Sequence, residues 1–350
     1  MATIILTGGG TAGHCTPHLA LLPYLKKDFD KIYYIGSEFG IERKIIEGVG
    51  IKYFFVDCAK LNRSFTFKNF TIPFKVLRGI NQASKLISTL KPDVIFSKGG
   101  YVALPTVIAG KRHKIPVVSH ESDYSIGLAN KLTSKYCKKV LTSFPSTAKE
   151  IKNGEYVGSP IRQNLFGASP TLAKKSFGFT DNKPILLVTG GSQGATAINN
   201  CLREALPLLL DKFNVLHICG KGNLDENIKM KGYVQIEYLD KMENAFACAS
   251  VCLSRAGANT VFELMSLNIP CVLIPLPKGN SRGDQILNAT YFYKLGLTSI
   301  LFQDMLTPYS LVNEINATYN NRLNLKQNFI KHPVKDASRE ISRIIVDCMH

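Results

Sequence analysis

Short apolar runs rich in Val and Ile alternate along this chain with longer stretches of mixed polarity. Such runs predict buried β-strands, and the stretches between them predict helices. We expect strands at residues 3–7, 31–35, 94–97, 117–120, 140–142, 185–189, 214–219, 235–238, 251–254 and 271–274. Near-continuous apolar strands separated by helices are typical of parallel sheets covered on both faces, so the predicted fold class is α/β. The last segment, 334–350, is predicted to be one helix with Ile341, Ile344 and Ile345 on its apolar face.

Two glycine-rich turns follow the first strand of each half of the chain. Residues 8–14 read GGGTAGH, and residues 190–194, about 180 residues further on, read GGSQG. A strand, a glycine-rich turn and a helix in this order direct backbone N–H groups and a helix N-terminus at a phosphate. The repeat, in a chain of 350 residues, therefore predicts two nucleotide-binding folds. Glycine and proline at residues 158–160 place the boundary between them there.

The net charge of +17 favours an anionic partner, and it is unevenly distributed. Residues 1–158 carry 23 Lys and Arg against 11 Asp and Glu. Nucleic acid, a phosphorylated substrate and an acidic lipid surface all fit this charge, but no nucleic-acid recognition motif accompanies it. The nine cysteines lack metal or disulfide spacing, so we expect neither. The chain shows no signal peptide and no apolar run near 18 residues, which predicts a cytoplasmic protein.

The first turn formally matches the G-x-G-x-x-G pattern of NAD-binding folds. Such folds carry an acidic residue at the end of the second strand. Here Ser37 stands at that place and Glu38 is the nearest acid, which weakens the NAD interpretation. His14, at the mouth of the turn, suits a general base because the pKa of histidine lies near operating pH, or it caps the turn. We expect His18 to be structural.

Two further polar loops follow strands in the first half. Lys98-Gly99-Gly100-Tyr101 comes after residues 94–97, and His120-Glu121-Ser122-Asp123 comes after 117–119, with Asn130 one short helix later. Because the carboxyl ends of parallel strands meet at one sheet edge, these loops and the glycine turn predict a polar pocket.

In the second half, Ser192 and its neighbouring amides would face a phosphate, and Arg162 could add a positive charge. Glu263 lies in a predicted helix after a second strand-and-turn unit, where it would accept from ribose hydroxyls or lie in solvent. Gln285 and Asn288 carry amides that suit sugar hydroxyls, since an amide both donates and accepts.

Residues 65–78 place phenylalanines among basic side chains. Phe70, Phe74, Lys75 and Arg78 are typical of an interfacial membrane contact, although a core helix with inward aromatics fits as well. The basic bias of this half favours the membrane.

Taken together, these residues resemble the MurG family, GT-B glycosyltransferases that transfer GlcNAc from UDP-GlcNAc to lipid I to form the lipid II of peptidoglycan synthesis. The matching motifs occur in family order along nearly the whole chain: GGTAGH with Pro17, KGGY, HE, GSPIR, GGSQGA, SRAGA and DQILNA. Two departures stand out. Ala12 replaces the usual glycine, and Ser122-Asp123 replaces the usual Gln-Asn.

The resemblance implies two Rossmann-like domains with a cleft between them. Residues 1–160 with the helix 334–350 would bind the acceptor and the membrane, and residues 161–333 would bind the UDP-sugar donor. The donor-binding residues it implies are Arg162, Ser192, Leu239, Ala258, Asn259, Glu263, Gln285 and Asn288. The acceptor-binding residues it implies are Gly10, Thr11, Ala12, Gly13, Tyr101, His120, Glu121 and Asn130.

The implied reaction is a single inverting displacement with His14 as the base for the muramyl 4-hydroxyl. No metal or cofactor is expected, because a helix N-terminus and basic groups can stabilise the departing UDP. The implied location is the cytoplasmic face of the bacterial cell membrane, as a peripheral protein on anionic lipid. Association with other cell-wall synthesis and division proteins is implied too. Alternatives are another UDP-sugar-dependent GT-B enzyme, such as a glycolipid synthase, and a UDP-GlcNAc 2-epimerase.

Overall fold

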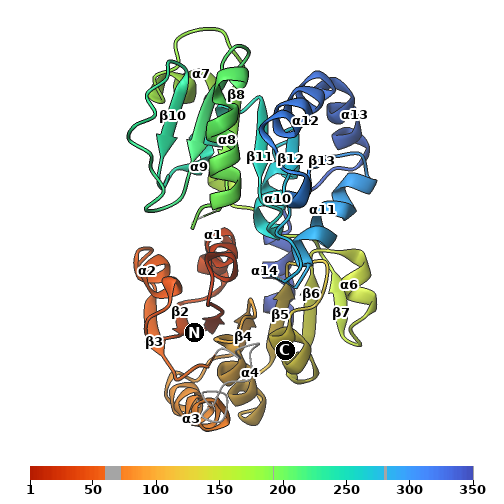
Figure 1. Cartoon of the computed structure of the whole chain (residues 1–350). Coiled ribbons are helices and arrows are strands. Elements are labelled where there is room, and N and C mark those ends of the chain that lie inside the picture. The colour runs from red at the N-terminus through yellow and green to blue at the C-terminus, as the bar shows by residue number, and fades with distance from the viewer. Residues whose placement is uncertain (60–71, 192, 280–281, 350) are drawn as a thin grey trace. The chain divides into compact units, whose positions relative to one another are not determined.

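The computed structural model describes residues 1–59, 72–191, 193–279 and 282–349. The chain divides into two compact units, shown in Figure 1. The first consists of Met1–Arg162 and Asp336–His350, and the second of Gln163–Lys335. Each unit is an α/β domain built on its own parallel sheet, which confirms the predicted fold class. Ser192 and Phe70 lie outside the described residues, as does the segment 65–71 of the phenylalanine-rich stretch.

The first domain contains a seven-stranded parallel sheet in the order β3-β2-β1-β4-β5-β6-β7. Its strands are β1 (Thr3–Thr7), β2 (Lys31–Gly36), β3 (Lys52–Phe55), β4 (Val94–Ser97), β5 (Val117–Glu121), β6 (Lys139–Thr142) and β7 (Gly154–Tyr156). Its helices are α1 (Thr16–Asp28), α2 (Ile41–Glu47), α3 (Ile72–Leu90), α4 (Ala103–Arg112), α5 (Leu128–Thr133), α6 (Pro145–Lys149) and α14 (Ser338–Asp347), with 3-10 turns η1 (Ala12–His14) and η3 (Ser134–Tyr136).

Alternation along the central strands gives each face of this sheet its own core. Ile4 and Leu6 of β1 pack with α1, α2 and α14, whereas Ile5 packs on the opposite face with α3 and α4. All three side chains are fully buried. A strand buried on both faces needs apolar side chains on each of them, which explains the continuous run of Ile4, Ile5 and Leu6 at the centre of β1.

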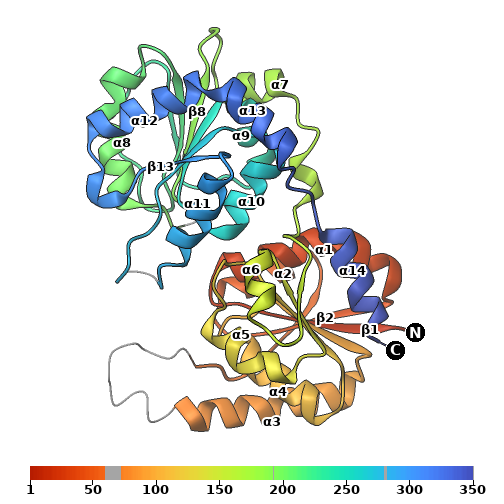
Figure 2. The same ribbon diagram turned by 90° about the vertical axis from the view of Figure 1, so that its right-hand side faces the viewer.

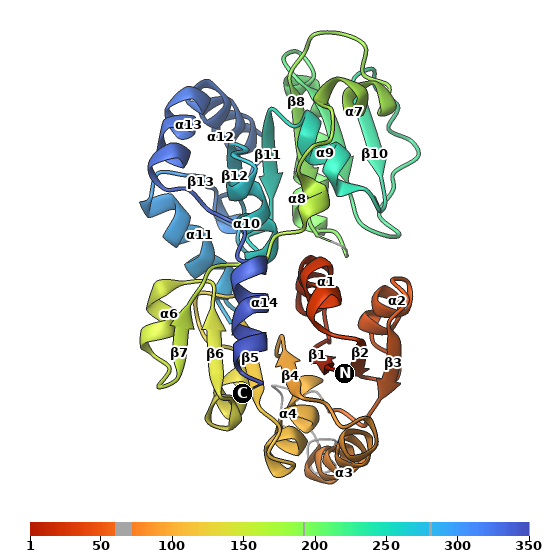
Figure 3. The ribbon, with the colours of Figure 1, turned by 180° about the vertical axis from the view of Figure 1, so that it is seen from behind.

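The C-terminal helix α14 packs against α1, beside it in Figures 2 and 3. Ile341, Ile344 and Ile345 are buried there, as the apolar face predicted. The helix begins at Ser338 and not at residue 334, so the predicted start was wrong. Asp336 explains the later start: its Oδ1 accepts from the amides of Ser338, at 2.9 Å, and of Ile161, at 2.7 Å, which ties the preceding segment to the chain at 161.

The second domain contains a six-stranded parallel sheet in the order β10-β9-β8-β11-β12-β13. Its strands are β8 (Ile185–Thr189), β9 (Asn214–Ile218), β10 (Tyr233–Ile236), β11 (Val251–Ser254), β12 (Cys271–Leu273) and β13 (Ser299–Ile300). Its helices are α7 (Pro170–Ser176), α8 (Thr196–Leu209), α9 (Met242–Cys248), α10 (Ala258–Ser266), α11 (Asp284–Lys294), α12 (Pro308–Asn320) and α13 (Arg322–Lys331), with 3-10 turns η4 (Gln163–Leu165) and η5 (Gln303–Met305).

The strand predictions failed mainly at the sheet edges. β3, β7 and β13 were not predicted, and each is the outermost strand of its sheet. These strands are two to four residues long and partly exposed, so they lack a continuous apolar run. The fourth edge strand, β10, was predicted at 235–238 but spans Tyr233–Ile236. Just beyond it, Glu237 Oε1 accepts from the amide of Gly222 at 2.7 Å.

His18 and His217 are two of the buried histidines that lower the stability of the fold at acid pH. Burial lowers the pKa of His18 to about 3, with the charge of Lys98 adding to the effect, and burial lowers that of His217 to about 3. His18 lies edge-on to Tyr34 and Phe96, with ring centroids 5.2 and 5.6 Å away, which confirms its structural role. His217 contacts the Tyr233 hydroxyl at 2.8 Å and Asn199 Oδ1 at 3.0 Å.

We therefore expect the free energy of unfolding to fall as pH drops from about 6.5 towards 3. The unfolded chain binds protons there that the folded chain excludes, at about 1.4 kcal/mol per pH unit for each histidine. Urea unfolding at pH 7, 5 and 4 measures this. His217→Gln should show a shallower fall than the unaltered chain, and equal slopes for the two proteins would contradict the prediction.

Candidate functional site

Three loops of the first domain meet at one edge of its sheet. β1, β4 and β5 are neighbours, and the strand order reverses at β1. The crevice beyond the carboxyl ends of strands at such a switch point is where open α/β sheets bind ligands. The loops that leave these strands are the glycine-rich turn, the segment Lys98–Tyr101 and the segment after Glu121.

The glycine-rich turn and the loop after β4 are in direct contact. Gly10 has φ +87°, and a Cβ there would lie 2.6 Å from Cε1 of Tyr101. Gly100 has φ +78°, and its Cβ would clash with the carbonyl of Gly9. Both positions thus need glycine, for the backbone conformation and for the close approach. Tyr101 is half-buried, and burial and the charge of Glu42 raise the pKa of its hydroxyl.

His14 ends the turn η1 and is held by the loop after β4. Its Nδ1 lies 3.1 Å from the carbonyl oxygen of Lys98. Because a carbonyl can only accept, Nδ1 carries the proton and donates it there. In the neutral ring the lone pair is then on Nε2, which is the tautomer that a general base needs. His14 is half-buried at the sheet edge.

Lys98 and His120 form a buried pair beneath this edge. Lys98 Nζ lies 2.6 Å from His120 Nδ1 and 2.6 Å from Ser122 Oγ. His120 Nε2 donates to the carbonyl of Gly158 at 2.9 Å, so Nδ1 is the acceptor for the lysine. Burial lowers the pKa of Lys98 to about 7, and burial and the lysine hold the pKa of His120 well below its ordinary value. A neutral His120 therefore orients the lysine.

Glu121 and Asn130 order the loop after β5. Glu121 Oε2 accepts from Asn130 Nδ2 and from the amide of Gly127, both at 2.8 Å, and its Oε1 accepts from the amide of Asp123 at 3.0 Å. Asn130 Oδ1 accepts from Ser119 Oγ at 3.2 Å. Both side chains are almost fully buried, so they order this loop from within.

The described part of the phenylalanine-rich segment lies on α3. Phe74 has 75% of its surface exposed, so the alternative of an inward aromatic does not hold for this residue. Lys75 and Arg78 are exposed as well, and Arg78 pairs with Asp57 at 3.0 Å.

In the second domain, the edge beyond β8, β11 and β12 contains a pocket of about 450 Å³. Its walls include Gly191, Gly194, Thr260, Gln285 and the side chain of Arg255. The second glycine-rich turn and the N-terminus of α10 thus border the same space, which suits an anionic ligand.

The predicted donor residues differ in how close they lie to this pocket. Gln285 lines the pocket and accepts from the amide of Leu276 at 3.0 Å. Asn288 is fully buried and donates to the carbonyl of Ala256 at 3.2 Å, which supports the turn before α10. The remaining ones are Ala258 and Asn259, the first residues of α10, Glu263, 9% exposed on the same helix, half-buried Leu239 after β10, and Arg162, the last residue of the first unit.

Sequence reasoning missed two side chains that order these edges. Gln303 lines the pocket of the second domain, where its Oε1 accepts from Arg255 Nη2 at 2.6 Å. Arg255 Nη1 donates to the carbonyl of Ile274 at 3.2 Å. Gln303 follows the strand β13, which has only two residues and therefore gives no apolar run in the sequence. Glu42 is the other, a buried carboxylate on α2. Glu42 comes four residues after Glu38, and acidic residues at this spacing are typical of the exposed face of a surface helix.

Comparison with known proteins decides the family. The glycosyltransferase family 28 N-terminal domain matches residues 4–142, and the family 28 C-terminal domain matches residues 185–341. A curated relative from Clostridium botulinum (strain Loch Maree / Type A3) is 49% identical over 349 residues, with 99% of each chain covered. It is named UDP-N-acetylglucosamine--N-acetylmuramyl-(pentapeptide) pyrophosphoryl-undecaprenol N-acetylglucosamine transferase.

The chain belongs to the MurG family within glycosyltransferase family 28. The crystal structure of Acinetobacter baumannii MurG is similar to it with a TM-score of 0.75 at 25% identity, covering 99% of this chain and 100% of that one. The UDP-GlcNAc 2-epimerase of Neisseria meningitidis, solved with UDP-GlcNAc, is similar with a TM-score of 0.66 at 14% identity, covering 100% and 99%. That second likeness reflects a shared fold. The family predicted from the motifs is therefore confirmed.

Proposed function

We propose that this chain transfers GlcNAc from UDP-GlcNAc to the 4-hydroxyl of the MurNAc-pentapeptide of lipid I and so forms lipid II. The observation that carries this function is the 49% identity, over 99% of the chain, to a transferase named for that reaction. The family 28 matches to both domains agree with it.

In this proposal each of the two sheet edges binds one of the substrates. UDP-GlcNAc binds the second domain, with its diphosphate at the second glycine-rich turn and the N-terminus of α10, its ribose at Glu263 and its sugar at Gln285. Lipid I binds the first domain beside the glycine-rich turn, where His14 and Tyr101 meet the muramyl sugar. The pocket of about 450 Å³ and the tautomer of His14 support these assignments.

The chemistry is one inverting displacement. The acceptor oxygen forms a bond to the anomeric carbon of GlcNAc while the bond from that carbon to the UDP oxygen breaks, so an α-linkage becomes a β-1,4 linkage. The hydroxyl proton passes to Nε2 of His14. The charge that develops on UDP is stabilised by backbone N–H groups, the helix N-terminus and Arg255. The proposal includes no resident metal or cofactor.

A UDP-release assay separates this function from its alternatives. The whole chain is incubated with UDP-GlcNAc in the absence and presence of a lipid I analogue. We expect UDP release only with the analogue. Release of UDP and free ManNAc without an acceptor would favour an epimerase, and release with diacylglycerol but not with lipid I would favour a glycolipid synthase.

We further propose that the first domain binds anionic membrane as a peripheral protein on the cytoplasmic side. None of the helices in the described ranges is long and apolar enough to cross a bilayer. Exposed Phe74 and the basic Lys75 and Arg78 on α3 suit the lipid interface, where an aromatic ring inserts and cations meet headgroups.

Replacing Phe74 with serine and Lys75 with glutamate together should weaken binding to vesicles containing anionic lipid about tenfold or more. Loss of one basic residue near such a surface costs roughly 1 kcal/mol, and the added negative charge and the lost aromatic ring weaken binding further. Co-sedimentation with vesicles measures it. Lys326→Glu on the exposed face of α13 in the second domain is the control and should bind like the unaltered chain. Equal binding by the double variant would count against this surface.

A further inference from the structure

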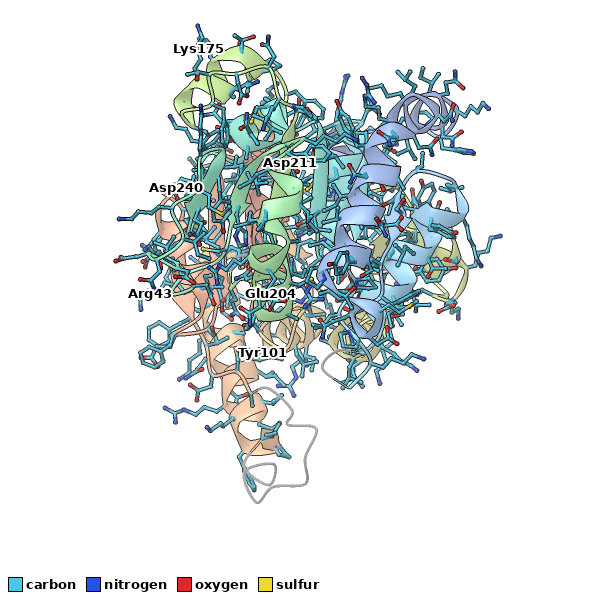
Figure 4. All side chains as sticks on the ribbon, turned by 45° about the horizontal axis from the view of Figure 1, so that its top comes forward. Arg43, Tyr101, Lys175, Glu204, Asp211 and Asp240 are labelled. Carbon is cyan, nitrogen blue, oxygen red and sulfur yellow. The ribbon has the colours of Figure 1, made fainter. Side chains whose placement is uncertain are left out.

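Glu42 is a fully buried carboxylate in the first turn of α2. Its neighbour Arg43, labelled in Figure 4, is exposed on the same helix and pairs with Glu47 at 3.0 Å. The helix thus directs one acidic side chain inward and leaves the other, Glu47, in solvent. Burying a carboxylate costs free energy unless hydrogen bonds satisfy it. The donors that bond to Glu42 therefore show which segments it connects.

The partners of Glu42 are donors on two different loops. Oε2 accepts from the amide of Gly10 at 3.2 Å, in the glycine-rich turn. Oε1 accepts from the amide of Ser37 at 3.3 Å and from the Ser37 hydroxyl, in the loop after β2. Within the described ranges no Lys or Arg forms an ion pair with this carboxylate. It therefore links the two loops through backbone and hydroxyl donors alone.

The contact is close along the turn. A Cβ at Gly9 would lie 2.6 Å from Cδ of Glu42, so the carboxyl group packs directly on the backbone of that glycine. The loop after β2 is itself anchored, because Tyr53 donates its hydroxyl proton to the carbonyl of Ser37 at 2.6 Å. Glu42 thus connects the glycine-rich turn to a loop that is itself held in place.

The same turn is held on its other side by the loop after β4. Tyr101 packs on Gly10, and the carbonyl of Lys98 accepts from His14, four residues after Gly10. His14 therefore belongs to a turn that is clamped between Glu42 on the β2 side and the Lys98–Tyr101 loop on the β4 side. The clamp also occupies the Gly10 amide, which leaves any diphosphate to other donors of the turn.

We propose that Glu42 is a positioning residue for the transfer: its buried carboxylate clamps the glycine-rich turn so that His14 stays against the Lys98 carbonyl with Nε2 presented to the acceptor hydroxyl. This inference rests on the proposed function, because it concerns how the base of that reaction is placed. Glu42 itself touches neither substrate.

The test is Glu42→Gln, which keeps the size of the side chain but replaces one acceptor oxygen by an NH₂ donor that faces N–H or O–H donors. We expect kcat with a lipid I analogue to fall about 10- to 100-fold, as for a small misplacement of a reacting group. The KM for UDP-GlcNAc and the number of UDP-GlcNAc sites per chain should stay as in the unaltered protein, since the donor domain is not altered. Loss of folding of the first domain would instead appear as a change in the urea unfolding curve of the variant.

Glu47→Gln, on the exposed face of the same helix, is the matched control and should keep full kcat. A Glu42→Gln protein whose kcat per UDP-GlcNAc site is within twofold of the unaltered value would overturn the inference. If this variant does not fold, Ser37→Ala removes one donor only, and it should lower kcat severalfold; unchanged kcat there would overturn the inference as well. An unaltered chain that makes no disaccharide-lipid would instead refute the proposed function.

Discussion

His14→Ala is expected to lower kcat about 10²- to 10⁴-fold, the usual contribution of a positioned general base. The KM for UDP-GlcNAc should change less than twofold, because the predicted donor site lies in the other domain. The physical reason is the tautomer. Nδ1 keeps its proton and donates a hydrogen bond to the Lys98 carbonyl at 3.1 Å, so Nε2 is the atom able to accept the proton of the acceptor hydroxyl. Initial rates at varied UDP-GlcNAc and lipid I analogue measure both constants.

The matched control is His113→Ala, which alters an exposed histidine that follows α4 of the same domain. It should leave both constants unchanged. Near-normal turnover by His14→Ala would remove His14 as the base and leave it as a residue that orders the glycine-rich turn.

Glu263→Gln should weaken UDP-GlcNAc binding about 10- to 100-fold, since a hydrogen bond to a charged group contributes roughly 1.5–3 kcal/mol. Glu263 lies nearly buried on α10, whose N-terminus borders the pocket of the second domain. In the proposal its carboxylate accepts from both ribose hydroxyls, which an amide cannot do equally. Because the ribose is remote from the reacting carbon, kcat at saturating UDP-GlcNAc should change little.

Titration calorimetry with UDP-GlcNAc measures the affinity directly. Glu204→Gln on the exposed side of α8, labelled in Figure 4, is the control and should bind with unchanged affinity. Unchanged affinity in Glu263→Gln would show that this carboxylate does not contact the donor.

The central strands of both sheets could be predicted because burial on two faces demands an unbroken apolar run. The bounds of β1, β4, β8 and β11 coincide with those predicted from their Val- and Ile-rich segments. The edge strands β3, β7 and β13 could not be found this way, since one side of each is open and its residues are mixed. The start of α14 was missed because Asp336 accepts a long-range hydrogen bond from the amide of Ile161, which no local pattern encodes.

The candidate site was predictable where chemistry follows a strand directly. His14 and Tyr101 both lie in loops after β1 and β4, and the structure brings them to one edge around Gly10. The residues that hold these two side chains in place could not be predicted. Glu42 reaches the glycine-rich turn from a helix 32 residues further along the chain, and the pairing of Lys98 with His120 depends on the adjacency of β4 and β5. Such contacts arise from the topology of the sheet.

The mass of the lipid product tests the central claim most directly. The unaltered chain is incubated with UDP-GlcNAc and lipid I, and the extracted lipid is analysed by mass spectrometry and by NMR of the new glycosidic linkage. The proposed function predicts a gain of one N-acetylglucosamine unit in β-1,4 linkage for each UDP released. An unchanged lipid mass while UDP-GlcNAc is consumed would contradict it.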